Sequence, residues 1–394
     1  MMRLDQERAR RANLDPMQRY YEHHEHLLLG SLSVRVTKAP AASPPAVPAA
    51  EEPAPEAPEM TPKATDAERA RHCVCVFPPE PLTEAVAALA TLRTQEATRL
   101  KPALTRAARG DGWRSVPWAG PDAVEDPFAG LGPELSNFSE VLAHLRTQWA
   151  LARRTRCAAD ARIDPILLAG PPGVGKSHFA PALADLIGVR MSVFSAGTAQ
   201  DAMQLCGSDA RWANTRPGIV FDLLAQGDSA APVLVVDEID KLTQESGGSR
   251  DTPIHTLLDL LEEDSARRYR DMSLQLEMDA SKVIVIATAN ERERISSPLL
   301  SRLTEFHIAP PTMEQRRLIL EGYLAALLEA HVCPSNMTLD SASAEVALAT
   351  PDLDVRELLR LTRTGFAGAL AAESDRVVLA PPRRGAVRQR IGFV

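Results

Sequence analysis

One short stretch, residues 166–177, limits the fold of this chain more than any other. Residues 166–169 (ILLA) form an apolar run that suits a parallel strand buried on both faces. They lead into Gly170-Pro-Pro-Gly-Val-Gly-Lys-Ser177, after which apolar residues recur at helical spacing. This order of strand, glycine-rich loop and helix is the context in which G-x-x-x-x-G-K-[ST] binds phosphates. The sequence therefore predicts an α/β nucleotide-binding fold.

Each residue type in this loop has a chemical role. Glycines let the backbone point its N–H groups at phosphate oxygens, and the N-terminus of the following helix favours negative charge. We expect Lys176 to neutralise the β- and γ-phosphates of a nucleotide, and the Ser177 hydroxyl to coordinate Mg²⁺. Pro181 should distort the helix slightly, because it lacks a backbone N–H. The predicted nucleotide-binding residues are Gly170, Pro171, Pro172, Gly173, Val174, Gly175, Lys176 and Ser177.

Polar residues also follow two other apolar runs. Residues 232–236 (PVLVV) end in Asp237 and Glu238. Residues 283–287 (VIVIA) precede Asn290. Ligands of open parallel sheets bind at the carboxyl ends of the strands, so these side chains should share one site with the phosphate loop. There Asp237 would hold Mg²⁺ through water, Glu238 would polarise an attacking water, and Asn290 would face the γ-phosphate. A turn-forming role is the alternative for Asn290.

The motifs GPPGVGKS, VDEIDK and IATAN occur in the order found in AAA+ ATPases. Residues 126–375 most closely resemble the ATPase module of the Lon proteases. The resemblance implies a P-loop parallel sheet flanked by helices and followed by an all-α lid. It assigns residues 170–177 to Walker A and residues 237–238 to Walker B, with Glu238 as the water-activating base. Asn290 matches sensor 1.

Two arginines extend the resemblance. Arg302, within SPLLSRLTEF, matches the arginine finger, which in AAA+ rings acts on the nucleotide of the neighbouring subunit. Arg356, within DVRELLR, matches the second sensor. A guanidinium supplied in this way can raise the rate of phosphoryl transfer by ~10³–10⁵. The alternative for Arg302 is a surface salt bridge. The resemblance thus implies ATP and Mg²⁺ as ligands, and the catalytic candidates are Glu238, Asn290, Arg302 and Arg356, with Ser177 and Asp237 at the metal.

Residues 207–218 have the spacing of the first pore loop of Lon, with Trp212 in the aromatic place. A ring of such aromatic residues could grip an extended polypeptide through apolar contact. The alternative is that Trp212 is a core residue. The implied partners are further copies of this chain, in a ring expected to be hexameric, and a protein substrate.

The chain departs from Lon on both sides of the matched region. Because only 38 residues follow Arg356, we expect no Ser-Lys peptidase domain, and the N-terminal substrate domain of Lon is not recognisable in residues 1–125. Many of the 31 prolines lie in residues 40–63, which predicts a Pro/Ala-rich disordered linker. The predicted divisions are a short segment at 1–39, this linker, a mostly helical region at 64–125, the nucleotide-binding core at 126–311, the helical lid at 312–377 and a basic tail at 378–394.

Charge and cysteine content narrow the function. The net charge of −8 disfavours a dedicated nucleic-acid binder without excluding one. Five scattered cysteines, a charged N-terminus and the absence of a run of ~20 apolar residues predict a cytoplasmic protein with no membrane segment. The leading hypothesis is a ring ATPase that unfolds or remodels protein partners without protease activity. The alternatives are an AAA+ switch that acts on nucleic acid or loads factors onto it, which the basic tail favours, and a slowly hydrolysing, nucleotide-regulated scaffold.

Overall fold

The computed structural model describes residues 66–89, 94–119, 126–130, 133–197, 202–208, 215–242, 253–334, 336–350 and 353–380. Four features of the predicted organisation lie outside these residues: the segment 1–39, the linker 40–63, residues 381–394 of the basic tail, and Trp212.

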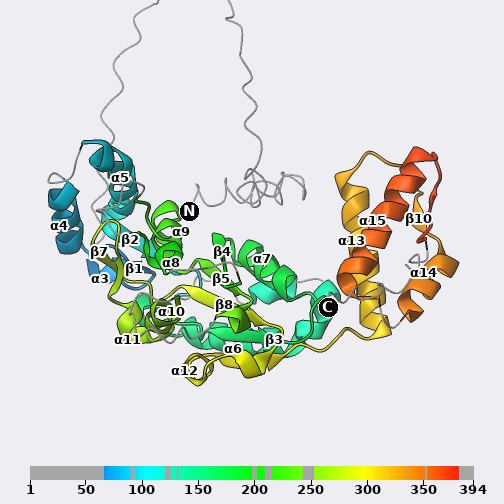
Figure 1. Ribbon diagram of the computed structural model, residues 1–394, viewed down its shortest axis with the longest axis horizontal. Helices are drawn as coiled ribbons and strands as arrows, with labels where there is room; N and C mark the ends of the chain where they lie inside the picture. Colours follow the sequence, from blue (N-terminus) through cyan, green and yellow to red (C-terminus); the bar gives the residue numbers. More distant parts are fainter. Residues whose placement is uncertain are drawn as a thin grey trace, which may run out of the picture. The chain divides into compact units, whose positions relative to one another are not determined.

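A five-stranded parallel sheet lies at the centre of the predicted nucleotide-binding core (Figure 1). Its middle strand, β8, and the neighbouring strand β3 are buried along their whole length, as expected of strands covered on both faces. The phosphate loop therefore leaves the sheet from an interior strand. In spatial order the strands are β4 (Met191–Ser195), β5 (Val233–Asp237), β8 (Ile284–Ala289), β3 (Ile166–Ala169) and β9 (Thr304–His307).

Strand register brings the predicted site residues to one edge. Ala169, the last residue of β3, pairs with Ala289, the last residue of β8. On the other side of β8, Val236 of β5 pairs with Ala287. The residues that follow these three strands therefore emerge at the same carboxyl-terminal edge of the sheet.

Helices flank the sheet and connect its strands (Figure 1). The helix that follows the phosphate loop, α7 (Lys176–Ile187), runs through Pro181 without a break. Phe179, Ala180 and Leu183 are fully buried there, and this packing outweighs the loss of one backbone hydrogen bond. The other helices of the core are α6 (Ser139–Ala152), α8 (Met203–Cys206), α9 (Ile219–Gln226), α10 (Pro253–Leu261), α11 (Glu263–Ala266) and α12 (Ser297–Leu300).

Several short elements lie between these helices and strands. The antiparallel pair β6 (Tyr269–Asp271) and β7 (Leu276–Met278) precedes β8. The 3₁₀ helices of the core are η2 (Pro127–Gly130), η3 (Pro133–Phe138), η4 (Ala158–Asp160), η5 (Ile239–Lys241) and η6 (Arg292–Arg294).

The region ahead of the core is mostly helical and also contains an antiparallel strand pair that the sequence analysis did not predict. Strands of three residues are too short to show an alternating pattern. Arg114, which is 3% exposed, donates hydrogen bonds to the carbonyls of Arg106 at the end of α5 and of Leu224 in α9, so this region packs directly on the core. Its elements are α3 (Asp66–Arg69), β1 (Cys73–Cys75), α4 (Pro79–Leu89), α5 (Thr94–Ala107), η1 (Arg109–Gly112) and β2 (Trp113–Ser115).

The C-terminal helices have a hydrophobic cluster of their own, centred on Leu320, Leu358 and Phe366. This agrees with the predicted helical lid. The all-α expectation needs one correction, because the two-residue strands β10 (Thr338–Leu339) and β11 (Arg376–Val377) form a parallel pair that no sequence pattern reveals. The helices are α13 (Met313–Ala330), α14 (Ser341–Ala349) and α15 (Val355–Ala371).

No helix in the described part of the chain combines the length and the apolar character needed to cross a membrane.

Candidate active site

The phosphate loop depends on glycine at three positions. Gly173 and Gly175 have φ values of +81° and +100°, in the left-handed region that favours glycine. At Gly170 an added Cβ would lie 2.3 Å from the carbonyl oxygen of Ile308. The helix α7 begins directly after Gly175, and no side chain caps that N-terminus. The loop therefore has the backbone shape and the helix end that bind phosphate oxygens.

The ammonium group of Lys176 lies at the centre of the site. Its Nζ donates hydrogen bonds to the carbonyl oxygens of Gly170 (2.7 Å) and Pro171 (2.8 Å) and to Oδ1 of Asn290 (3.0 Å). Burial lowers the pKa of Lys176, and nearby acidic side chains oppose that shift. The lysine of Walker A and the predicted sensor 1 residue are thus in direct contact.

Two acidic residues at the end of β5 are held by one threonine of β8. Thr288, which is 2% exposed, donates from Oγ1 to Oδ1 of Asp237 (2.6 Å) and accepts from the backbone N–H of Glu238 (3.0 Å). Glu238 has a φ of 55°, a strained conformation for this residue that costs roughly 1–3 kcal/mol. An added Cβ at Gly197 would lie 2.9 Å from Oε2 of Glu238, so the glycine gives that carboxylate its space.

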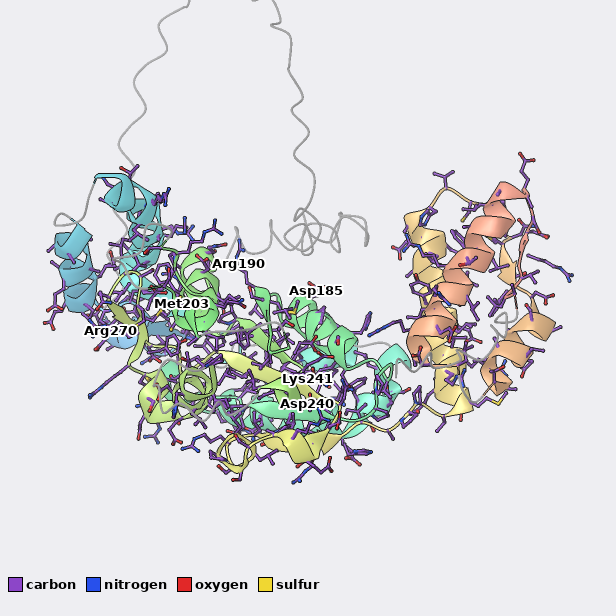
Figure 2. The ribbon with its side chains drawn as sticks, in the orientation of Figure 1. Asp185, Arg190, Met203, Asp240, Lys241 and Arg270 are labelled. Carbon is purple, nitrogen blue, oxygen red and sulfur yellow. The ribbon has the colours of Figure 1, made fainter. Side chains whose placement is uncertain are left out.

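A third carboxylate, that of Asp240, lies on η5 directly after Glu238 and is labelled in Figure 2. Its oxygens accept hydrogen bonds from the backbone N–H groups of Asn290 and Glu291, each at 3.3 Å. Asp240 therefore fixes the backbone of Asn290 while the side chain of Asn290 contacts Lys176. The sequence analysis quoted Asp240 only as part of its motif, and its burial to 4% exposure is visible only in the fold.

The residues predicted to hold Mg²⁺ fit that ion chemically. Ser177 is exposed on the first turn of α7, and Asp237 is partly exposed at the end of β5. Mg²⁺ is commonly bound through one or two protein oxygens together with water and substrate phosphates, and a hydroxyl and a carboxylate match this pattern. When bound, the ion neutralises charge on the β- and γ-phosphates. Among the described residues no group of three or more His, Cys, Asp or Glu is arranged to hold a metal ion.

The phosphate loop is supported by η3, a contact that the sequence analysis missed. Asn137 donates from Nδ2 to the carbonyl of Val174 (3.0 Å). Phe138 stacks on Phe179 of α7, with ring centroids 4.9 Å apart. The lid helix α13 also packs against η3. Such a short 3₁₀ segment carries no periodic signal from which this role could be read.

The N-terminus of the lid helix α15 also lies at the phosphate loop. Asp354 caps this helix by accepting a hydrogen bond from the backbone N–H of Glu357 (2.7 Å). An added Cβ at Gly173 would lie 2.7 Å from Oδ2 of Asp354. Arg356, two residues further on, is exposed. The structure therefore places the predicted second sensor on a helix that begins beside Walker A.

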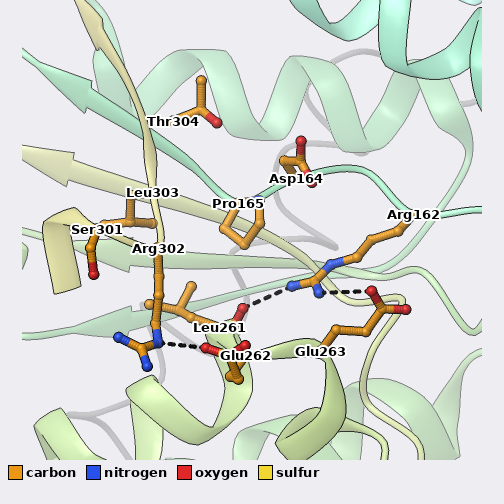
Figure 3. Close-up of a pocket in the computed structure, with 10 residues that line it drawn as sticks. All are labelled: Arg162, Asp164, Pro165, Leu261, Glu262, Glu263, Ser301, Arg302, Leu303 and Thr304. Atoms are coloured by element: carbon orange, nitrogen blue, oxygen red, sulfur yellow. Dashed lines mark hydrogen bonds and ion pairs between the residues drawn. The ribbon is translucent and has the colours of Figure 1, made fainter. Parts of the chain in front are cut away.

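Arg302 lies away from this cluster, at the opposite edge of the sheet. It precedes β9, whose first residue, Thr304, pairs with Ile166 at the beginning of β3. The phosphate loop leaves the other end of β3, four residues later, which is ~13 Å at the usual strand rise. Arg302 donates from Nε to Oε2 of Glu262 (2.9 Å), so the ion pair considered as its alternative role is present (Figure 3).

The base of the predicted pore loop is described, although Trp212 is not. The backbone N–H of Ser208 donates to the carbonyl of Arg216 (3.2 Å), and the backbone N–H of Gly218 donates to Oδ2 of Asp271 (2.7 Å). Asp271 of β6 therefore anchors the chain at the end of this loop. The question of whether Trp212 is a pore or a core residue lies outside the described residues.

The parallel sheet, the glycine loop with its buried lysine, and the acidic strand end together define a P-loop nucleotide-binding domain. Residues 166–310, which contain the sheet, the phosphate loop and the acidic strand end, match the family described as "ATPase family associated with various cellular activities (AAA)". The predicted α/β fold and the predicted ATPase class are both confirmed.

Curated relatives match the predicted resemblance to Lon. A mitochondrial Lon protease homolog of Phaeodactylum tricornutum is 35% identical over 159 residues, which cover 40% of this chain and 18% of that protein. Lon protease 4 of Sorangium cellulosum is 26% identical over 293 residues, which cover 71% of this chain and 36% of the relative. The chain thus spans about a third or less of the length of these two relatives. Among solved structures, a mutant of RuvB from Thermotoga maritima is 18% identical, with a TM-score of 0.42, and the match covers 64% of this chain and 69% of that one.

Proposed function

We propose that this chain hydrolyses ATP at the described site and uses that energy, within a ring of its own copies, to unfold or remodel protein partners. One observation carries the ATPase part: the contacts among Lys176, Asn290, Asp237 and Glu238, through Thr288 and Asp240, join three strand ends into one site. The proposal keeps the predicted division into a core at 126–311 and a lid at 312–377.

Within this site each residue has a separate task. When ATP binds, the ammonium group of Lys176 would donate to the β- and γ-phosphates in place of the carbonyl oxygens of Gly170 and Pro171. Ser177 and Asp237 would hold Mg²⁺. Glu238 accepts a proton from the attacking water, and Asn290 orients that water at the γ-phosphate. Arg356 acts from the lid, which couples the state of the nucleotide to the position of α15.

The position of Arg302 supports the ring. A guanidinium at the amino-terminal edge of the sheet is separated from the phosphate loop of its own subunit by the length of β3. A second copy that presents its phosphate loop to this edge would receive Arg302 as a finger. A cyclic arrangement of copies satisfies every site in the same way. Six subunits is the number that the family resemblance implies.

A protein is favoured over nucleic acid as the object of remodelling. Two features support this choice, the net charge of −8 and the placement of Trp212 at the aromatic position of a Lon-like pore loop. The relatives bearing the name Lon protease match this chain over 18% and 36% of their lengths, around the ATPase motifs. Peptide-bond cleavage is therefore not part of the proposal, and it is tested separately below.

The experiment uses the full chain and its Glu238→Gln variant, which should bind ATP without hydrolysing it. ATP turnover of the unchanged protein is measured with a permanently unfolded protein, reduced and carboxymethylated α-lactalbumin, and separately with single- and double-stranded DNA. We expect stimulation by the unfolded protein, and its stable capture by Glu238→Gln in ATP. Lys176→Ala, which cannot engage the phosphates, is the matched control and should capture nothing.

Each outcome decides between the candidates. Stimulation and capture by DNA alone would replace protein remodelling with the nucleic-acid switch. Appearance of α-lactalbumin fragments with ATP, and their absence with Lys176→Ala, would show that proteolysis must be added to the function.

A further inference from the structure

The amino-terminal edge of the sheet carries a groove of about 400 Å³ beside β3 and β9 (Figure 3). Two arginine–glutamate pairs lie in it. Arg302 meets Glu262 at 2.9 Å, and Arg162 meets Glu263 at 3.5 Å. The two glutamates are adjacent in sequence, and their ion-pair partners show whether they have the same role.

Their surroundings differ. Glu263 is shared by Arg162, Arg267 (2.7 Å) and Lys282 (3.7 Å), and Lys282 is buried, so this carboxylate is the centre of a structural cluster. In the described part of the chain Glu262 has one ion-pair partner, Arg302. The charge of Glu262 is therefore directed at the predicted finger.

The contacts hold one side of the guanidinium group. Arg302 donates from Nε to Glu262 and from Nη1 to the carbonyl of Pro298 (3.1 Å). Its third nitrogen, Nη2, makes no hydrogen bond to any described residue. The side chain as a whole is 34% exposed, so part of it is accessible from outside the subunit. A long side chain held in this way has lost much of its rotamer freedom before a ligand arrives.

The carboxylate partner is itself mounted on a fixed backbone. Glu262 lies between α10 and α11, where its N–H donates to the carbonyl of Leu258 and its carbonyl accepts from the N–H of Ala266. Helix α10 also packs against α12, the helix that contains Pro298. One acceptor for Arg302 therefore belongs to α12, and the other directly follows α10, which packs against α12.

We propose that Glu262 is a positioning residue for Arg302, which it holds in the orientation needed to reach the nucleotide of the neighbouring subunit. Glu262 touches neither the nucleotide nor the reacting atoms, and it acts only through Arg302. The inference rests on the proposed function, specifically on Arg302 acting in trans. It assigns a role to an exposed ion pair whose contribution to stability alone would be small.

The test is an ATPase assay with mixed subunits of the full chain. The recipient, Arg302→Ala, keeps Glu238 and lacks the finger. The donor, Glu238→Gln, cannot hydrolyse ATP and keeps Arg302. If Arg302 acts in trans, the mixture recovers activity that neither variant has alone. A second donor carries Glu262→Ala in addition to Glu238→Gln, and we expect it to restore about tenfold less activity, since small errors in position are costly in catalysis.

Two further variants separate positioning from folding. Glu262→Gln keeps an oxygen that accepts from Nε, and in the donor it should restore an intermediate rate. Glu345→Ala breaks a comparable exposed ion pair, with Arg317 in the lid, and in the donor it should restore the full rate. In unmixed rings Glu262→Ala should lower kcat with little change in KM, and adding it to Arg302→Ala should cause no further loss. Sedimentation confirms that each variant assembles.

The outcomes distinguish the two proposals. No recovery with the first donor would overturn the trans role of Arg302, and with it the proposed function. Recovery with the first donor and equal recovery with the Glu262→Ala donor would overturn only the role of Glu262. An additional loss when Glu262→Ala is combined with Arg302→Ala would also overturn it, because Glu262 would then act independently of the finger.

Discussion

Thr288 and Asp237 are joined by a hydrogen bond of 2.6 Å between neighbouring strands of the sheet, and the same threonine oxygen accepts the N–H of Glu238 at 3.0 Å. One buried hydroxyl on β8 thus sets the position of Asp237, the last residue of β5, and of Glu238, which follows it. Since Glu238 has a left-handed backbone, this contact also stabilises a strained conformation at the predicted catalytic base.

Replacement of Thr288 by Val should therefore impair turnover more than binding. The substitution keeps the shape of the side chain and removes the hydroxyl, so that Asp237 loses this donor and the N–H of Glu238 loses this acceptor. We expect kcat to fall by roughly 10–100-fold, with a loss of about 1–3 kcal/mol in the free energy of unfolding. ATPase kinetics and urea denaturation measure the two effects. Thr288→Ser, which keeps the hydroxyl, should retain most activity. Full activity in Thr288→Val would contradict the role given to this contact.

A second prediction concerns the space beside Glu238. An alanine at Gly197 would place its Cβ 2.9 Å from Oε2 of Glu238 and force that carboxylate to move. Since the displaced group is the end of a flexible side chain, the melting temperature should change little while kcat falls about tenfold. ATP affinity should stay the same in an equilibrium binding assay. Gly368→Ala, in the lid helix α15, meets no atom within 4 Å and should leave turnover unchanged. Equal kinetics for the two variants would argue against this placement of Glu238.

Asp240 provides a third prediction. Its two oxygens accept the N–H groups of Asn290 and Glu291, and an asparagine has only one acceptor oxygen to offer. Asp240→Asn should therefore lower the free energy of unfolding by about 1–2 kcal/mol and shift Asn290, with a fall in kcat. Thermal unfolding and steady-state kinetics would reveal both. If kcat were unchanged despite the lost stability, Asp240 would be structural only.

The sequence was sufficient to predict those site residues whose positions follow from short motifs along the chain. The strand, loop and helix around Lys176 can be predicted because glycine, lysine and an apolar run each have a fixed place in the motif. The acidic residues after β5 and Asn290 after β8 could be brought together for a similar reason, since parallel strands end at one edge. Their contacts confirm that these strand ends form one site.

The parts that could not be predicted depend on contacts between distant segments. Thr288 has no special spacing in the sequence, and its role exists only because β8 lies between β3 and β5. Asn137 acts from a 3₁₀ turn without periodicity. The ion pair of Arg302 with Glu262, 40 residues away, likewise requires the packed helices to be known. The short strands β1, β2, β10 and β11 have too few residues to show a pattern.

The last prediction concerns pH and Asp271, whose side chain is completely buried at the base of the predicted pore loop. Burial raises the pKa of Asp271 from 3.8 to about 6, although hydrogen bonds from Ser273, Gly218 and Leu274 oppose the shift. An acid with a raised pKa binds more protons in the folded than in the unfolded protein between these values. Its contribution to stability is therefore fully present below pH 3.8 and is lost as the pH rises through 6. Over this pH range the free energy of unfolding should fall by about 3 kcal/mol because of Asp271.

Urea denaturation between pH 4 and 7 measures how the free energy of unfolding depends on pH. Comparison of the unchanged protein with its variants should isolate the part due to Asp271. Asp271→Asn should be less stable at every pH in this range, since an NH₂ group replaces one of the two carboxylate oxygens and cannot accept a hydrogen bond. The part of the pH dependence of stability that is due to Asp271 should vanish in this variant. Ser273→Ala removes a hydrogen bond of 2.6 Å that favours the ionised form, so it should raise the pKa of Asp271 further and extend the slope above pH 6. Equal slopes in Asp271→Asn and the unchanged protein would mean that Asp271 has the same pKa in the folded and unfolded states.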